Sequence, residues 1–199
     1  MKTLGIIGTA GRGDDGDKLS KSSWERMLAV ANEAIIRIKP DYLVSGGAAW
    51  SDHLAVQLFI DYKHFVGLKL FLPVKFDGSF DEQELTIPFN CGRVLNHYHR
   101  DFSKVIGIDT LAQIGHVIEE GIVPATGKGF HGRNTQIAYA SHDLLAFTFG
   151  DGEKLKDGGT KDTWDKFMKR SDRGDGYHYN LTDHKIYRIE SKNDTEKFW

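Results

Sequence analysis

The chain has 199 residues, of which 40% are hydrophobic and 27% charged, with a formal net charge of −2. This length and balance are typical of one globular domain that buries a core without disulfides, and the single cysteine, Cys91, excludes an internal disulfide. No apolar run approaches the ~20 residues that a membrane span needs, and no signal peptide precedes the first strand-like segment. We expect one cytoplasmic domain over residues 1–199, with no membrane association and, since no basic stripe is present, no nucleic-acid partner.

Short apolar runs alternate with segments of helical periodicity in the first third of the chain. Buried strands are expected at residues 3–8, 42–45 and 68–72. A loop over residues 9–21 separates the first strand from a helix capped by Ser22 or Ser23 and stopped by Pro40. Ser51 or Asp52 is expected to cap the second helix, which ends at Gly67. This alternation predicts an α/β fold, a Rossmann-like doubly wound and mostly parallel sheet with helices on both faces.

The alternation lapses over residues 74–126, which we interpret as an insertion into the domain. The insertion could form a lid, an oligomer contact or a second wall of a binding pocket. One helix is expected within it, over residues 101–120, and then a loop over 121–129. The later elements are expected to be a helix at 134–140, a strand at 143–149, a helix at 160–169 and a last strand at 185–190.

Two glycine-rich turns stand about a hundred residues apart, each where a loop leads into a helix. They supply Ser45, Gly46, Gly47 and Ala48, and then Gly158, Gly159 and Thr160. A helix N-terminus presents unpaired N–H groups that bind anions such as phosphate, and glycine lets the backbone approach the ligand. Ligands of parallel sheets bind at the carboxyl ends of the strands. The two turns therefore predict one nucleotide-sized ligand held from two sides.

Two further segments could contact such a ligand. Residues Gly8, Thr9, Gly11 and Arg12 leave the carboxyl end of the first strand. The string from Gly11 to Gly16 matches GxGxxG, but the helix follows too late for a dinucleotide fingerprint. Arg133 and Asn134 lie near the start of a helix, where the arginine could pair with phosphate or could be a surface residue beside a capping asparagine.

Metal ligands are sparse in the sequence. His97 and His99 could bind a metal but have no accompanying cysteine cluster or HExxH motif, and surface or hinge histidines are the alternative. Asp14, Asp15 and Asp17 could hold a hydrated Mg²⁺ or could form a solvated loop. We expect no cofactor, with Mg²⁺ as the alternative.

Taken in order, the motifs resemble those of one Rossmann-like superfamily. It contains the DNA-processing protein A core, the Lonely Guy phosphoribohydrolases and small stand-alone nucleotide-binding domains of the SLOG type. The resemblance rests on Ser45-Gly46-Gly47-Ala48 with Asp52, on Arg133-Asn134, and on Gly158-Gly159-Thr160 with Thr163. It covers most of residues 1–73 and 127–190 and implies nucleotide binding.

Two positions depart from the superfamily pattern. Trp50 stands where the superfamily usually has glycine, so the indole could stack on a base or could block the pocket. Thr163 takes the position of the catalytic glutamate of the Lonely Guy enzymes, whose motif proline is also absent. The phosphoribohydrolase mechanism therefore does not transfer intact.

These observations predict a protein that binds a nucleotide or nucleotide-derived phosphate ligand. The first hypothesis is hydrolysis or transfer at the N-glycosidic bond, in which Arg133 neutralises phosphate and Asp52 or Asp162 stabilises the oxocarbenium ion or activates water. Alternatively, Asp52 is a helix N-cap and Asp162 a first-turn partner of the helix dipole. The second hypothesis is a non-catalytic sensor or sequestering protein, and the third is a DNA-associated protein. We also expect a homo-oligomer.

Overall fold

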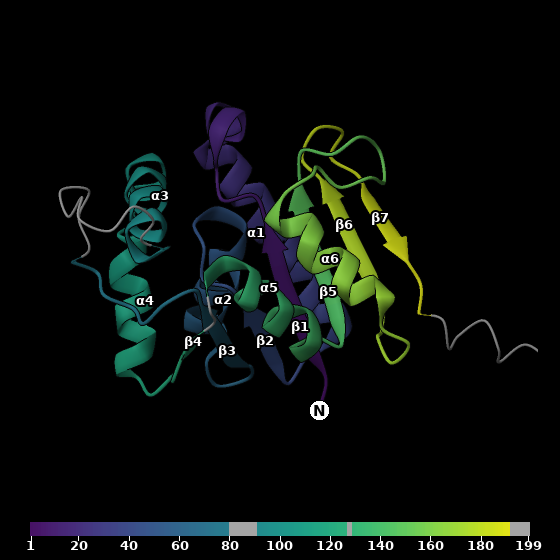
Figure 1. Ribbon diagram of the computed structural model, residues 1–199, viewed down its shortest axis with the longest axis horizontal. Coiled ribbons are helices and arrows are strands. Elements are labelled where there is room, and N and C mark those ends of the chain that lie inside the picture. The colour runs from purple at the N-terminus through teal and green to yellow at the C-terminus, as the bar shows by residue number, and fades with distance from the viewer. Residues whose placement is uncertain (80–90, 127–128, 192–199) are drawn as a thin grey trace, which may run out of the picture.

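The computed structural model describes residues 1–79, 91–126 and 129–191 (Figure 1). Its seven-stranded sheet has the order β4-β3-β2-β1-β5-β6-β7, and only the β6–β7 pair is antiparallel among these strands. The strands are β1 (Thr3–Gly8), β2 (Tyr42–Ser45), β3 (Gly67–Leu72), β4 (Ala125–Thr126), β5 (Asp143–Thr148), β6 (Gly176–Asn180) and β7 (Ile186–Ile189). The predicted α/β fold with a mostly parallel sheet is confirmed.

Helices cover both faces of the sheet. They are α1 (Lys21–Ile38), α2 (His53–Tyr62), α3 (Cys91–Ile106), α4 (Thr110–Glu119), α5 (Gly129–Ala140) and α6 (Gly159–Lys169), with short 3₁₀ helices η1 (Gly13–Lys18) and η2 (Trp50–Asp52). In Figure 1, α5 and α6 lie in front of the sheet and α1 lies behind it. Each face has its own apolar cluster, with Met27 and Leu54 in one and Ile137 and Phe167 in the other. No helix in the described ranges is long and apolar enough to cross a bilayer.

The start of α1 differs from the prediction because a capping box lies two residues earlier. The Ser20 hydroxyl accepts from the Ser23 N–H at 3.2 Å, and the Ser23 hydroxyl accepts from the Ser20 N–H at 3.3 Å. The two hydroxyls thereby satisfy donors that a helix start leaves unpaired. Ser22 and Ser23, the predicted caps, therefore lie inside the helix.

Two other helix boundaries differ, and one strand was missed. Helix α2 ends at Tyr62, and Gly67 begins β3 instead of ending the helix. Helix α5 begins at Gly129, so Arg133 and Asn134 lie one turn inside it. Strand β6 was not predicted, because its run of tyrosine, histidine and asparagine lacks the apolar signal of a buried strand.

The described part of the insertion contains two helices, not one over residues 101–120. Gly107 has a φ of +76°, which glycine adopts readily, and Asp109 then caps α4 by accepting from the Ala112 N–H at 2.9 Å. Together these residues end α3 and start α4. Both helices join the core of the α1–α2 face, where Phe102 and Ile114 are fully buried.

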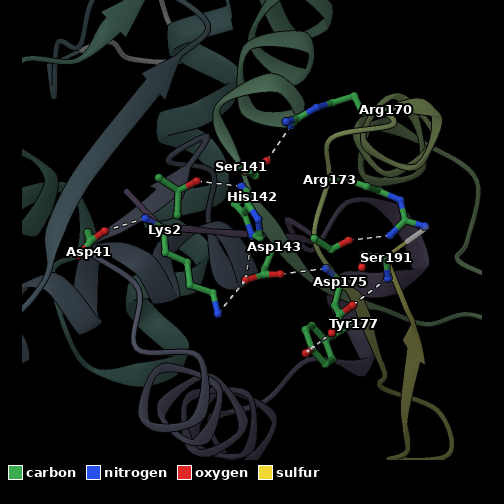
Figure 2. Close-up of polar contacts among 12 residues, drawn as sticks. Lys2, Asp41, Ser141, His142, Asp143, Arg170, Arg173, Asp175, Tyr177 and Ser191 are labelled. Carbon is green, nitrogen blue, oxygen red and sulfur yellow. Dashed lines mark hydrogen bonds and ion pairs between the residues drawn. The ribbon is translucent and has the colours of Figure 1, made fainter. Parts of the chain in front are cut away.

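A polar network closes the amino ends of the central strands (Figure 2). Asp143 is buried at the start of β5 and accepts from the Asp175 N–H at 2.8 Å, while the Lys2 ammonium lies 3.7 Å from its other oxygen. Asp175 in turn accepts from the Tyr177 hydroxyl and the Ser191 N–H. These residues tie strands together at the end of the sheet opposite to the predicted ligand site.

Candidate functional site

A cavity of about 210 Å³ lies at the carboxyl ends of β1 and β5, on the face covered by α5 and α6. Strand β1 has β2 on one side and β5 on the other, so the chain order reverses at this point. Such a switch point is the usual ligand site of open parallel sheets, since the loops diverge there. The cavity is lined by Ile7, Gly8, Thr9, Ala10, Arg12, Asp15, Ala48, Asp52, Phe130, Arg133, Asn134, Ile137, Thr148, Lys156, Asp157, Gly158, Gly159, Thr160 and Thr163.

The N-terminus of α6 forms one wall of the cavity. Gly158 is the N-cap, with a φ of 141° and no side chain to cap the first N–H groups. The Thr160 hydroxyl donates to the Gly8 carbonyl oxygen at 2.8 Å, which fixes the helix start against the end of β1. The partial positive charge of the helix start therefore faces the cavity.

Arg133 also lines the cavity, with a buried guanidinium group. The residue is 9% exposed, and its Nη1 and Nη2 donate to the Gly46 carbonyl at 3.2 Å and the Asn134 side-chain oxygen at 3.3 Å. Its Nε is buried without a hydrogen-bond partner among the described residues. Burial lowers the pKa of Arg133, and the nearby charge of Asp52 opposes that shift. Arg133 is thus a buried cation with incomplete hydrogen bonding.

Asp52 lies at the N-cap position of α2, but its carboxylate does not cap that helix. Its oxygens instead accept from the N–H of Gly8 at 3.2 Å and the N–H of Ala48 at 3.5 Å. Burial raises the pKa of Asp52, although Arg133 and the backbone amides lower it. The N-cap alternative is therefore wrong, and Asp52 is a buried carboxyl group at the cavity wall.

Arg12 stacks between two aromatic rings at the cavity rim. Its guanidinium carbon lies 4.7 Å from the centre of the Phe130 ring and 5.3 Å from that of Tyr98. The guanidinium of Arg133 also lies over Phe130, at 5.2 Å. Within the described part of the chain, neither arginine lies within 4.0 Å of a carboxylate. Two cations without ion-pair partners thus share one ring beside the cavity.

The sequence did not indicate Lys156, Asp157 or Phe130 as site residues, and it indicated Asp15 only as a possible Mg²⁺ ligand. Asp15 accepts from the Thr9 hydroxyl at 2.7 Å and pairs with the Lys156 ammonium at 2.6 Å. These residues lie in irregular loops or at a helix start, so no periodic pattern marks them. Only the acidic run around Asp15 was a signal, and it suggested Mg²⁺. In the structure the Lys156 ammonium forms an ion pair with one carboxylate oxygen of Asp15.

Histidines and acids do not converge as a metal site. Among the residues that the structure describes, no group of three or more His, Cys, Asp or Glu side chains is arranged to hold a metal. His99 is fully buried, which corrects the surface alternative, and its ring bonds to the Gly47 carbonyl and the Thr110 hydroxyl. His97 lies 3.6 Å from Asp101 on the exposed side of α3.

The Gly46–Gly47 turn lies beneath the cavity wall and does not line it. A Cβ on Gly46 would approach the Asp52 carboxylate to 2.6 Å and the Arg133 guanidinium carbon to 3.0 Å. The Ser45 hydroxyl accepts from the Gly47 N–H at 3.1 Å. The small residues of this turn therefore allow Arg133 and Asp52 to pack closely against the backbone. Of the motif Ser45-Gly46-Gly47-Ala48, only Ala48 lines the cavity.

Three other predicted site residues also lie outside the cavity lining, namely Gly11, Trp50 and Asp162. Trp50 is 4% exposed and packs against Phe102 with 4.5 Å between ring centres, so it neither stacks in the cavity nor blocks it. The Asp162 carboxylate accepts from the Asn134 side chain at 3.1 Å and from Lys166 at 2.8 Å. Asp162 therefore holds α5 against α6, and Asp52 is the predicted acid that reaches the cavity.

Comparison with known proteins gives one informative relationship. No family model matches the chain. An uncharacterized protein of Acanthamoeba polyphaga mimivirus is 37% identical over 177 residues, which cover 82% of this chain and 89% of the viral protein. This chain belongs to the same family. Family members share nearly the whole domain rather than a short motif, because the match spans most of both chains.

Proposed function

We propose that the cavity binds a nucleotide or nucleotide-derived ligand through its phosphate. The observation that carries the proposal is the pair of arginines, Arg12 and Arg133, which share the Phe130 ring beside the N-terminus of α6. Two guanidinium groups and a helix start are suited to a phosphate, since arginine matches its oxygens in a bidentate way. The resemblance to the nucleotide-binding superfamily supports the same ligand.

The arrangement of charges in the lining also favours an anion beside the two arginines. Lys156 and Asp15 neutralise one another at 2.6 Å, and burial raises the pKa of Asp52, which disfavours its negative form. With Asp157 the lining carries three acidic and three basic residues, so an anion is favoured by the position of Arg12 and Arg133 beside the start of α6 and not by a net positive charge. A bound phosphate would supply acceptors for the guanidinium of Arg12 and for the second N–H of Arg133 Nη1 and Nη2, each of which makes one hydrogen bond within the protein.

The size of the cavity favours one nucleotide over a dinucleotide. Its volume of about 210 Å³ lies below the range of roughly 300–1,000 Å³ that is usual for small-molecule sites. The phosphate and sugar would fill this space, with the base at the open rim near Phe130.

Titration calorimetry with AMP, adenosine and inorganic phosphate tests the proposal. We expect AMP to bind more tightly than adenosine, and Arg133→Gln to weaken AMP binding roughly tenfold to a hundredfold, because charge-assisted hydrogen bonds contribute about 1.5–3 kcal/mol. Arg37→Gln, at an exposed position on α1, is the control and should bind AMP as the unmodified protein does. Failure of every phosphate-bearing ligand to bind, or unchanged affinity in a folded Arg133→Gln variant, would refute the proposal.

Hydrolysis of the N-glycosidic bond is a second candidate function, favoured by the position of Asp52. A buried carboxyl group with a raised pKa at the cavity wall can act as a general acid that protonates the leaving base as the C1′–N bond breaks. Water then adds at C1′, and the proton that it loses returns to the Asp52 carboxylate. Thr163, at the glutamate position of the related motif, donates to the Gly159 carbonyl at 3.1 Å and offers no carboxylate. Among the acids proposed from the sequence for this reaction, Asp52 is therefore the one that lines the cavity.

Incubation with nucleoside monophosphates and chromatography for free base separates the two functions. Release of base that is lost in Asp52→Asn, with AMP binding retained, supports hydrolysis. Tight binding without release would identify a sensor or sequestering protein instead.

A further inference from the structure

Helix α3, which the insertion contributes, reaches both loops at the carboxyl end of the sheet with two successive residues. The ring of Tyr98 lies under the guanidinium of Arg12, 5.3 Å from its carbon, in the loop after β1. The adjacent His99 bonds through Nε2 to the Gly47 carbonyl at 3.0 Å, in the turn after β2. One helix therefore braces two loops that lie far apart in the sequence.

We propose that Tyr98 is a positioning residue that holds Arg12 at the cavity, so that the insertion sets the affinity for the phosphate of the ligand. This inference rests on the proposed function. The proposal gives α3 a role in ligand binding, although α3 does not line the cavity and contains none of the sequence motifs.

The surroundings of Arg12 explain why it needs such support. It lies between Gly11 and Gly13, which have φ values of +74° and +55°, in a loop where the arginine is exposed. Within the described residues, its side chain makes no hydrogen bond or ion pair, and its contacts are the rings of Tyr98 and Phe130. Ordering a free arginine on binding costs side-chain entropy. Two flanking rings reduce that cost before the ligand arrives.

His99 makes the brace rigid. It is fully buried, and burial lowers its pKa to about 4, so the ring is neutral at pH 7. Its Nε2–H donates to the Gly47 carbonyl, and its Nδ1 accepts from the Thr110 hydroxyl at 2.9 Å. Because both ring nitrogens are bonded, α3 has a fixed position against the β2 turn, and Tyr98 is held with it.

Calorimetry on a double-mutant cycle with AMP and adenosine tests this role. We expect Tyr98→Leu to weaken AMP binding about twofold to fivefold, the size of an exposed cation–π contact, and to leave adenosine binding unchanged. Tyr98→Phe keeps the ring and should bind AMP as the unmodified protein does. In an Arg12→Gln background, Tyr98→Leu should cause no further loss, because the side chain that it positions is gone.

A measurement without ligand tests the same contact independently. We expect the NMR order parameter of the Arg12 Nε–H group to fall in Tyr98→Leu and to stay high in Tyr98→Phe. The positioning role is overturned if that order parameter is the same in both variants, if AMP binding does not change, or if the loss persists in the Arg12→Gln background. When AMP fails to bind the unmodified protein, the proposed function fails, while the order parameters still decide whether Tyr98 holds Arg12.

Discussion

Trp50 adopts a φ of +61°, a left-handed conformation that is costly for a bulky residue. That φ gives a physical reason for the glycine that the resemblance places at this position. Here the indole is buried against Phe102 of α3, and burial of such a large ring offsets strain of about 1–3 kcal/mol. The sequence could not reveal this contact, because the two residues are far apart along the chain.

Gly8 permits the close approach of three segments at the end of β1. A Cβ there would lie 2.3 Å from the Phe147 carbonyl oxygen and 2.6 Å from the Ser51 side chain. Because the first of these is backbone in the neighbouring strand, it cannot move aside cheaply. We expect Gly8→Ala to lower the free energy of unfolding by about 1–3 kcal/mol, measured by urea denaturation.

Gly115 provides the matched control for Gly8. It lies inside α4, and the nearest atom to an added Cβ would be in the Phe76 ring at 3.8 Å. Alanine favours a helix interior over glycine, so Gly115→Ala should raise the free energy of unfolding by about 0.5–1 kcal/mol. Equal stability of the two variants would contradict the steric argument.

At the scale of elements, two neutral histidines join the insertion to the rest of the domain. His53 of α2 and His99 of α3 are fully buried with 5.3 Å between ring centres. Burial lowers the pKa of His53 to about 3 and that of His99 to about 4. Above pH 6.5 both rings are neutral in the folded and unfolded chains, so they add no pH dependence there. Below it the unfolded chain binds protons that the folded chain does not.

We therefore expect the free energy of unfolding to fall as the pH drops from about 6.5 to 4, by about 1.4 kcal/mol per pH unit for each histidine. The raised pKa of Asp52 makes the free energy of unfolding rise as the pH drops. The contribution of one histidine is therefore measured as the difference between the unmodified protein and a histidine variant. His99→Gln removes one titrating group and should flatten the slope over this range, as measured by urea denaturation at a series of pH values. Parallel slopes in the two proteins would contradict the assignment.

The sequence predicted correctly those elements that are marked by a pattern of neighbouring residues. Strand β1 and strand β2 have the predicted bounds, because each is a short apolar run between loop residues. Eleven of the cavity-lining residues are among the predicted site residues, including Gly8, Arg12 and Arg133. The cavity residues that were missed, such as Phe130 and Lys156, depend on how distant loops meet. The Gly46–Gly47 motif was recognised, but its role under Arg133 follows only from packing.

At the scale of the whole molecule, the two ends of the sheet are built differently. The amino ends carry a polar network in which Asp143 accepts from the Asp175 N–H, and Asp175 accepts from the Ser191 N–H and from the side chains of Tyr177 and Arg188 (Figure 2). The carboxyl ends carry glycine turns, a helix start and cations with incomplete partners around a cavity. Buried polar atoms without a hydrogen-bond partner occur at both ends among the described residues, Arg133 Nε beside the cavity and Asp143 Oδ2 and Arg173 Nε in the amino-end network. The carboxyl end therefore differs in its glycine turns, its helix start and its cavity, which is the pattern expected of a ligand site.

The insertion shares its core with the sheet, which bears on how the molecule unfolds. Ile114 and Val117 of α4 are fully buried in the cluster that contains Leu54 of α2 and Leu4 of β1. Separating α3 and α4 from the sheet would expose both sides of this cluster and break the bond from His99 to Gly47. We therefore expect the domain to open as one cooperative unit.

Native-state hydrogen exchange measures this cooperativity directly. The amides of α4 should exchange with a free energy within about 1 kcal/mol of those in β1 and β5, because they are released only by global unfolding. The amides of α6, on the other face, serve as the comparison for a helix that belongs to the predicted core. If the amides of α4 exchange far faster than those of the central strands and of α6, the insertion unfolds as a separate unit. The contact between Tyr98 and Arg12 would then be broken whenever the insertion opens.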